Sequence, residues 1–299
     1  MKHTQLYHPR HWLSWLVVAI IRSVALLPAR TLMCFGPPLG SLLHLLIRRR
    51  RRIARNNLQR AFPEKTPEDI DALVYAHFQA LGIMVVEMLI TWFKRGKQIP
   101  AKIEITGQQY LEQALAKGKG VLLLSAHFTS LEIGGALLQR DTQFDIHGMY
   151  RPHENPVFEA VIKQGRQHWF KTMIARDNVK KMLRSLKRGL IVWYAPDQAY
   201  GGRNSIQVPF FGHNVATNPG TSRIAKLSGA PVIPYFPIRK SNGLDYELRL
   251  LPAIENFPSD DLTEDALRIN QLIEDIAREY PEQYYWVHRR FKYSDNPIK

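Results

Sequence analysis

Short runs of β-branched and aromatic residues alternate with helical patterns from Ile103 to the end of the chain. The β-rich runs lie at 103–106, 121–126, 145–150, 190–195, 206–210, 231–237 and 246–251. Helical patterns separate most of them and also precede them, at 53–62, 66–97, 108–117, 129–139, 155–169, 177–187, 217–228 and 262–280. This alternation predicts an α/β fold with a mixed, largely parallel sheet flanked by helices on both faces. In such sheets, functional sites gather at the carboxyl ends of the strands.

The N-terminal part of the chain has a different character. Residues 12–27 and 31–47 are apolar, and each segment is slightly shorter than the roughly 20 residues that a free-standing transmembrane helix needs. Five arginines at 48–52 follow directly. Such a cluster marks the cytoplasmic end of a span and attracts anionic head groups by about 1 kcal/mol per charge. We therefore expect residues 1–52 to form a membrane anchor with a basic flank, either one tilted span or a hairpin bent at the prolines, followed by one domain at 53–299. A buried helix pair in a soluble protein is the alternative.

Positive charge is concentrated at the same end. Of the net charge of +15, eleven positive charges lie in residues 1–60, which contain no Asp or Glu. A basic end on a nearly balanced body predicts contact with an anionic surface. Nucleic acid is a weaker candidate for that surface, because no helix-turn-helix, zinc-finger or RNP-like motif accompanies the arginines. The single cysteine, Cys34, excludes a disulfide framework and a cysteine-based zinc site, which is typical of a cytosolic or membrane-associated protein.

The stretch LSAHFTSLE at 124–132 places His127 where a strand is expected to end. If His127 lies in the turn and Glu132 in the first helical turn, the carboxylate can hold one imidazole nitrogen. The other nitrogen is then free to take a proton from a hydroxyl nucleophile. Within one regular helix the two side chains would point roughly 140° apart and could not meet. Thr129-x-x-Glu132 is also a capping-box pattern, in which Glu132 binds backbone N–H groups instead, so both roles stay open.

Other catalytic signatures do not occur in the sequence. There is no G-x-S-x-G elbow, no H-E-x-x-H zinc motif and no G-x-x-x-x-G-K-[ST] phosphate loop. Ser125 would share a strand face with His127, but nothing else in the sequence supports a serine nucleophile.

Four further polar residues lie near other predicted strand ends or early and late helical turns. They are Arg151 in YRPHENP, Arg166 late in a helix, Asp197 in WYAPDQAYGG and Arg223 after TNPGT. Each alone fits a structural role, because helical arginines usually pair or face solvent and an aspartate before glycines usually makes a turn hydrogen bond. Since several lie at strand exits, one pocket could collect them as substrate-binding residues.

Six motifs in order carry a resemblance to a known family: HFTSLE, YRPHENP, the Gly-Arg at 165–166, VWYAPDQAYG, VPFFG at 208–212 and EQYYWVHRRFK. Together they resemble the late acyltransferases of lipid A biosynthesis, most of all the lauroyl type, within the H-x4-D/E glycerolipid acyltransferase superfamily. The resemblance extends from the apolar N-terminal segments to Lys292. It implies a glycerol-3-phosphate acyltransferase-like fold, with 53–299 as the catalytic domain.

The resemblance further implies transfer of a fatty acyl chain from acyl carrier protein to the 3-hydroxyl of a hydroxyacyl chain on a Kdo-containing lipid A precursor. The reaction would occur at the cytoplasmic face of a Gram-negative inner membrane, with anionic lipids as neighbours. His127 would be the general base, Glu132 its orienting acid, and Arg166 and Asp197 further functional positions. No metal or redox cofactor is implied. Two alternatives remain: a glycerophospholipid or lysophospholipid acyltransferase, which shares the H-x4-D/E chemistry, and a non-catalytic membrane adaptor that uses the basic end.

Overall fold

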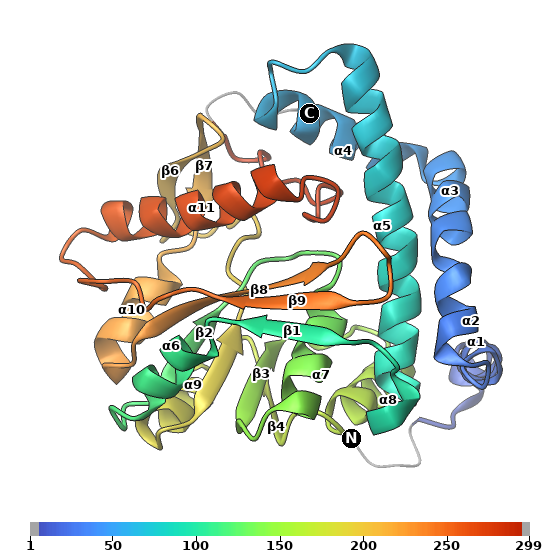
Figure 1. Cartoon of the computed structure of the whole chain (residues 1–299), viewed down its shortest axis with the longest axis horizontal. Helices are drawn as coiled ribbons and strands as arrows, with labels where there is room; N and C mark the ends of the chain where they lie inside the picture. The colour runs from blue at the N-terminus through green and yellow to red at the C-terminus, as the bar shows by residue number, and fades with distance from the viewer. Residues whose placement is uncertain (1–5, 295–299) are drawn as a thin grey trace.

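The computed structural model describes residues 6–294 and has a seven-stranded sheet at its centre, in the order β1-β9-β8-β2-β5-β3-β4 (Figure 1). The sheet strands are β1 (Ile103–Thr106), β2 (Val121–Leu124), β3 (Ile146–Tyr150), β4 (Thr172–Ala175), β5 (Ile191–Tyr194), β8 (Val232–Arg239) and β9 (Tyr246–Leu250). The strands β6 (Ile206–Phe210) and β7 (His213–Thr217) form a separate antiparallel hairpin. The helices are α1 (Trp12–Val24), α2 (Ala29–Cys34), α3 (Gly36–Leu46), α4 (Arg48–Ala61), α5 (Pro67–Phe93), α6 (Gln108–Leu115), α7 (Leu131–Asp141), α8 (Pro156–Arg166), α9 (Val179–Lys187), α10 (Gly220–Ser228) and α11 (Leu262–Glu279).

Five neighbouring strands, β8, β2, β5, β3 and β4, run parallel. Strand β9 pairs antiparallel with β8, and β1 pairs parallel with β9. The prediction of a mixed, largely parallel sheet flanked by helices is therefore confirmed. The expected strands at 121–126 and 190–195 are each shorter than predicted, and β4 and β7 were not predicted.

Strand β2 is buried on both faces, as its sequence Val-Leu-Leu-Leu indicates. Because side chains alternate along a strand, Leu122 and Leu124 join a core cluster with residues of α9 and α11. Val121 and Leu123 join the opposite cluster, with residues of α6 and α7. The central strands are thereby enclosed between two helical layers, and their carboxyl ends converge at one edge of the sheet.

Helix α5 lies along one side of the sheet, with α2 and α3 on its outer side (Figure 1). It begins with a capping box, in which Thr66 and Asp69 exchange side-chain and backbone hydrogen bonds. A proline occupies the first helical position, directly after Thr66. Helix α3 approaches α5 so closely that a Cβ at Gly40 would lie 2.3 Å from the carbonyl oxygen of Phe78. A Cβ at Gly82 would lie 2.2 Å from the Gly40 nitrogen. Glycine at both positions lets the two backbones touch.

The apolar N-terminal segments form a bent helix pair rather than one straight helix. The axes of Pro9–Val24 and Ala29–Leu46 meet at 109°, close to Pro28. Many large apolar side chains of this pair face outward; the most exposed are Leu26, Leu13, Trp12, Leu46 and Leu45, at 62–81%. A buried helix pair would not expose such residues. Of the two membrane geometries left open by the sequence, the bent pair matches the described conformation.

The arginine run forms the first turn and a half of α4, so the helix expected at 53–62 begins five residues earlier. The same helix buries Ala54, Leu58 and Ala61 in the core cluster that contains Leu122. Arg50 donates to the carbonyl oxygen of Val287 at 2.9 Å. The helix is thus continuous through residue 52, where the sequence suggested that the anchor ends.

Candidate active site

His127 and Asp197 are brought together by the register of two neighbouring parallel strands. Leu124 at the end of β2 is the register partner of Tyr194 at the end of β5. His127 and Asp197 each lie three residues beyond these partners. Because parallel strands end at the same edge, both side chains emerge side by side at the edge where sites are expected.

The Asp197 carboxylate accepts two hydrogen bonds from His127. The ring Nδ1 donates to Oδ1 at 2.5 Å, and the backbone N–H donates to Oδ2 at 3.0 Å. The Asp197 side chain is 3% exposed and the His127 side chain is 31% exposed. Because an ionised carboxylate can only accept, the proton must reside on Nδ1, which leaves Nε2 as an acceptor. An imidazole held in this way can take a proton at Nε2.

The same contacts determine the charge states of the pair. Burial lowers the pKa of His127. The negative charge and hydrogen bond of Asp197 together raise it by more than burial lowers it, so the net shift is upward from 6.5. Burial raises the pKa of Asp197, whereas the charge of His127 and its two hydrogen bonds lower it, so the net shift is downward from 3.8. Asp197 therefore stays ionised while His127 titrates.

The turn that carries His127 is fixed by the C-terminal segment 283–285. The backbone N–H of Thr129 donates to the carbonyl oxygen of Gln283 at 2.7 Å, and the N–H of Tyr285 donates to the carbonyl oxygen of His127 at 2.9 Å. The Gln283 side chain also accepts from the N–H of Arg239 and donates to its carbonyl oxygen, both at 2.9 Å. The turn is thereby tied to β8 as well as to the C-terminal segment.

Glu132 binds neither the imidazole nor the start of its own helix. Its carboxylate accepts from Arg166 through Nε to Oε1 at 2.8 Å and Nη2 to Oε2 at 2.7 Å, and from the indole of Trp92 at 2.8 Å. Helix α7 begins after Ser130 without a side-chain cap, so the capping box is not formed. Both local interpretations of Glu132 were therefore wrong about its partner. A guanidinium fork matches a carboxylate better than a single imidazole N–H does.

Both side chains of the Glu132–Arg166 pair stay charged at neutral pH. Burial raises the pKa of Glu132, but Arg166 and Trp92 lower it by more, so the carboxylate remains ionised. Burial lowers the pKa of Arg166, but Glu132 raises it by more, so the net shift is above its usual value. The Arg166 guanidinium also lies 5.9 Å from the ring centroid of Tyr150. Arg166 is accordingly an immobilised cation near the carboxyl edge of the sheet, since Tyr150 ends β3.

The remaining candidates lie apart from this constellation. Arg151 is exposed and reaches Glu154 at 3.4 Å. Arg223 is exposed on the first turn of α10. Neither makes a hydrogen bond to His127 or Asp197. Asp197, which the sequence predicted as a substrate-binding residue, is in the structure the carboxylate partner of His127.

A buried ion pair behind the His127 turn was not predicted from the sequence. Arg239 donates to both carboxylate oxygens of Glu87 at 2.6 and 2.7 Å, and the two side chains are 5% and 1% exposed. Tyr246 donates to Glu87 at 2.5 Å, and Arg239 reaches the hydroxyl of Thr129 at 3.4 Å. The only sequence signal for this pair was a glutamate in the apolar part of α5, where a charge needs a partner. Within residues 6–294, no group of three or more His, Cys, Asp or Glu side chains is arranged to hold a metal ion.

Known proteins match this chain over almost its full length. The family model for bacterial lipid A biosynthesis acyltransferases matches residues 1–293. The lipid A biosynthesis lauroyltransferase of Escherichia coli K12 is 37% identical over 290 residues, which cover 97% of this chain and 94% of that protein. The palmitoleoyltransferase of the same organism is 35% identical over 286 residues, covering 95% and 92%. The solved structure of the 1-acyl-sn-glycerophosphate acyltransferase PlsC from Thermotoga maritima has a TM-score of 0.39 and 11% identity, covering 88% of this chain and 99% of that one.

Proposed function

Since the chain belongs to the bacterial lipid A biosynthesis acyltransferase family, and is thus an acyltransferase, we propose that it acylates a Kdo-containing lipid A precursor. The donor is the thioester of acyl carrier protein, and the acceptor is the 3-hydroxyl of a hydroxyacyl chain. The observation that carries the proposal is the pairing of His127 with the buried Asp197. An alcohol has a pKa far above neutrality, so its attack on a thioester requires a base of this kind.

His127 acts as the general base. Its Nε2 takes the proton of the acceptor hydroxyl as that oxygen bonds to the thioester carbonyl carbon. The tetrahedral intermediate then expels the thiolate, which receives the proton from Nε2. Asp197 keeps Nδ1 protonated and stabilises the imidazolium that forms between these steps. No residue of the chain is acylated.

Glu132 acts through Arg166 rather than through His127. The carboxylate holds Nε and Nη2 of the guanidinium, so that Nη1 is left to bind an anionic group of a substrate or the developing oxyanion. Glu132 is on this view a positioning residue, and Arg166 is the substrate-binding one.

We place the enzyme at the cytoplasmic face of the inner membrane, and the exposed apolar helix pair supports this location. Its outward-facing side chains, such as Leu13 and Leu26, enter the apolar layer, and the arginines at the start of α4 meet anionic head groups. The basic character of this end also suits acyl carrier protein, which is acidic, so association should weaken as salt rises.

The test is an assay of the full chain in neutral detergent, with acyl carrier protein thioester and a tetra-acylated precursor, read by mass spectrometry of the lipid product. We expect one added acyl mass, and loss of that product in His127→Ala protein of unchanged melting temperature. Full activity of His127→Ala would refute the mechanism. Acylation of lysophosphatidate in place of the precursor would identify a glycerophospholipid acyltransferase instead.

A further inference from the structure

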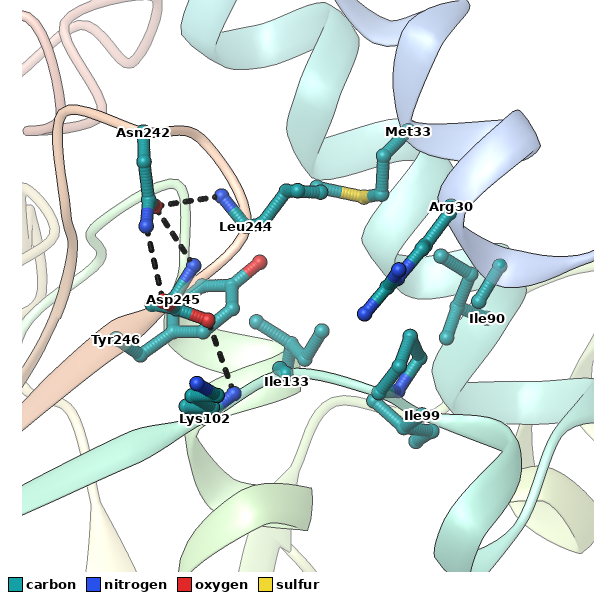
Figure 2. A pocket seen from close by; sticks show the side chains of 13 residues that line it. Arg30, Met33, Ile90, Ile99, Lys102, Ile133, Asn242, Leu244, Asp245 and Tyr246 are labelled. Atoms are coloured by element: carbon teal, nitrogen blue, oxygen red, sulfur yellow. Dashed lines mark hydrogen bonds between the residues drawn. The ribbon is translucent and has the colours of Figure 1, made fainter.

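A pocket of about 210 Å³ lies between the apolar helix pair and the sheet (Figure 2). Its walls come from α2, the last turns of α5, the segment before β1, the start of α7 and the turn between β8 and β9. This volume is many times the roughly 10–15 Å³ that a single water molecule needs on the same measure. It can therefore hold a small head group and a few methylene groups, but not a whole lipid.

Part of the pocket wall is hydrocarbon. The side chains that form it are Met33 from α2, Ile90 from α5, Ile99, Ile133 from α7 and Leu244. Each methylene group that a ligand buries against such a wall contributes about 0.8 kcal/mol. The wall thus suits the first part of an alkyl chain.

The rest of the wall is cationic. Figure 2 shows Arg30 extending from α2 toward the centre of the pocket. Its guanidinium has no ion pair or hydrogen bond with any residue in the range 6–294. Lys102 lines the pocket from the opposite side, on the segment that leads into β1.

One carboxylate also lines the pocket, and its oxygens already accept hydrogen bonds within the protein. Asp245 accepts from the backbone N–H of Lys102 at 3.0 Å and from the Asn242 amide at 2.9 Å. These hydrogen bonds hold the β8–β9 turn against the segment before β1. With Arg30 and Lys102 against the one carboxylate, the net charge of the pocket is positive.

The pocket opens beside the element that we place in the membrane. Helix α2 is part of the second arm of the bent apolar pair. The wall residues Ile90 and Ile133 lie close in sequence to Glu87 and Glu132, which belong to the networks around the His127 turn and Arg166. A lipid in this pocket would therefore reach from the bilayer to the edge of the catalytic domain.

We propose that this pocket binds a phosphate-bearing amphiphile, with Arg30 and Lys102 on the phosphate and the first methylenes on Met33, Ile99 and Leu244. The remainder of the tail lies along the exposed helix pair. Two sources offer this chemistry, an anionic phospholipid of the bilayer and a phosphorylated glycolipid. The inference rests on binding residues outside the His127–Asp197 pair, so it stands or falls independently of acyl transfer.

The experiment is native mass spectrometry of the full chain in neutral detergent, titrated with each probe. The first pair of probes is phosphatidate and diacylglycerol, and the second is a phosphorylated tetra-acylated glucosamine disaccharide and its dephosphorylated form. Arg30→Gln and Lys102→Gln should each weaken binding of a phosphorylated probe about fivefold, which corresponds to about 1 kcal/mol per cation near a membrane surface. Arg22→Gln is the matched control, because Arg22 is an exposed arginine on the same helix pair but outside the pocket.

Weakening of phosphatidate alone would assign the pocket to a bilayer phospholipid, and weakening of the disaccharide alone would assign it to a glycolipid. Either result supports the proposal. Met33→Trp, which fills the pocket without changing charge, should lower binding of the same probe. The proposal is overturned if Arg22→Gln weakens binding as much as Arg30→Gln does, because the effect would then be general attraction. It is also overturned if the phosphate-free probes bind as tightly as the phosphorylated ones.

Discussion

Replacing Asp197 by asparagine tests the orientation of His127 with minimal change in shape. The native carboxylate accepts at both oxygens, from the ring Nδ1 and from the backbone N–H of His127. Asparagine offers one acceptor oxygen and one amide donor. If its oxygen serves the backbone, its NH₂ faces Nδ1 and forces the proton onto Nε2. If its oxygen serves the ring, the backbone donor meets another donor.

The first orientation is the better one, because both hydrogen bonds are kept, and it removes the acceptor nitrogen that the proposed base requires. General-base catalysis contributes roughly 10²- to 10⁴-fold to rate, so kcat should fall by about that factor. An unpaired buried backbone N–H costs about 1–3 kcal/mol, so the second orientation would appear as lost stability instead. A fall in kcat with a small change in melting temperature is therefore expected.

The pH profile provides an independent readout. The wild-type enzyme should lose kcat/KM as pH falls through the pKa of His127, which lies above the ordinary 6.5 because Asp197 raises it against the effect of burial. In Asp197→Asn the carboxylate charge is gone while burial remains, so the acidic limb of any residual activity should move to lower pH. Asp275→Asn, an exposed aspartate, is the control. Activity within threefold of wild type with an unmoved acidic limb would refute the role given to Asp197.

Three other predictions concern the supporting networks. Glu132→Gln and Arg166→Gln should each lower kcat/KM, and the double variant should be little worse than the more damaging single one, because the two residues act as one unit in a double-mutant cycle. Glu87→Gln should lower the free energy of unfolding in urea by about 3–5 kcal/mol, as expected for breaking a buried ion pair, whereas the exposed Glu64→Gln should change it little. Burial lowers the pKa of His77 to about 4, so between pH 6.5 and pH 4 the unfolded state binds a proton that the folded state does not. The free energy of unfolding measured in urea titrations should therefore fall by roughly 3 kcal/mol over that range. A His77→Gln variant with the same pH dependence would contradict this.

The positions of the site residues along the chain could be predicted, but their partners could not. His127 follows a run of apolar residues that only a doubly buried strand explains, and Asp197 follows another. That the two strands are neighbours depends on strand order, in which β2 lies beside β5 rather than beside β3. The sequence shows only which residues are close along the chain. The nearby Glu132 was therefore predicted as the partner of His127, and the distant Asp197 was not.

The N-terminal region shows the same limit. Apolar content and the arginine run predicted an anchor with a basic flank, and the exposed side chains of the bent pair agree with that pattern. Composition did not reveal that the arginines begin a helix whose later turns belong to the core. Nor did it reveal that Gly40 and Gly82 let α3 touch α5, because such contacts depend on which helix faces are apposed.

The five-residue spacing of His127 and Glu132 does not bring the two side chains into contact. It places both side chains at the same edge of the sheet, where each is taken by an oppositely charged partner from another segment: Asp197 after β5 and Arg166 at the end of α8. The pKa values of both carboxylates are lowered and that of Arg166 is raised, so these three groups keep their charges through the neutral range. Within this constellation of four residues, His127 is then the group whose charge changes, with a pKa that Asp197 raises above its ordinary value. Because the charges of the other three residues stay constant, we expect the titration of His127 to set the acidic limb of the activity.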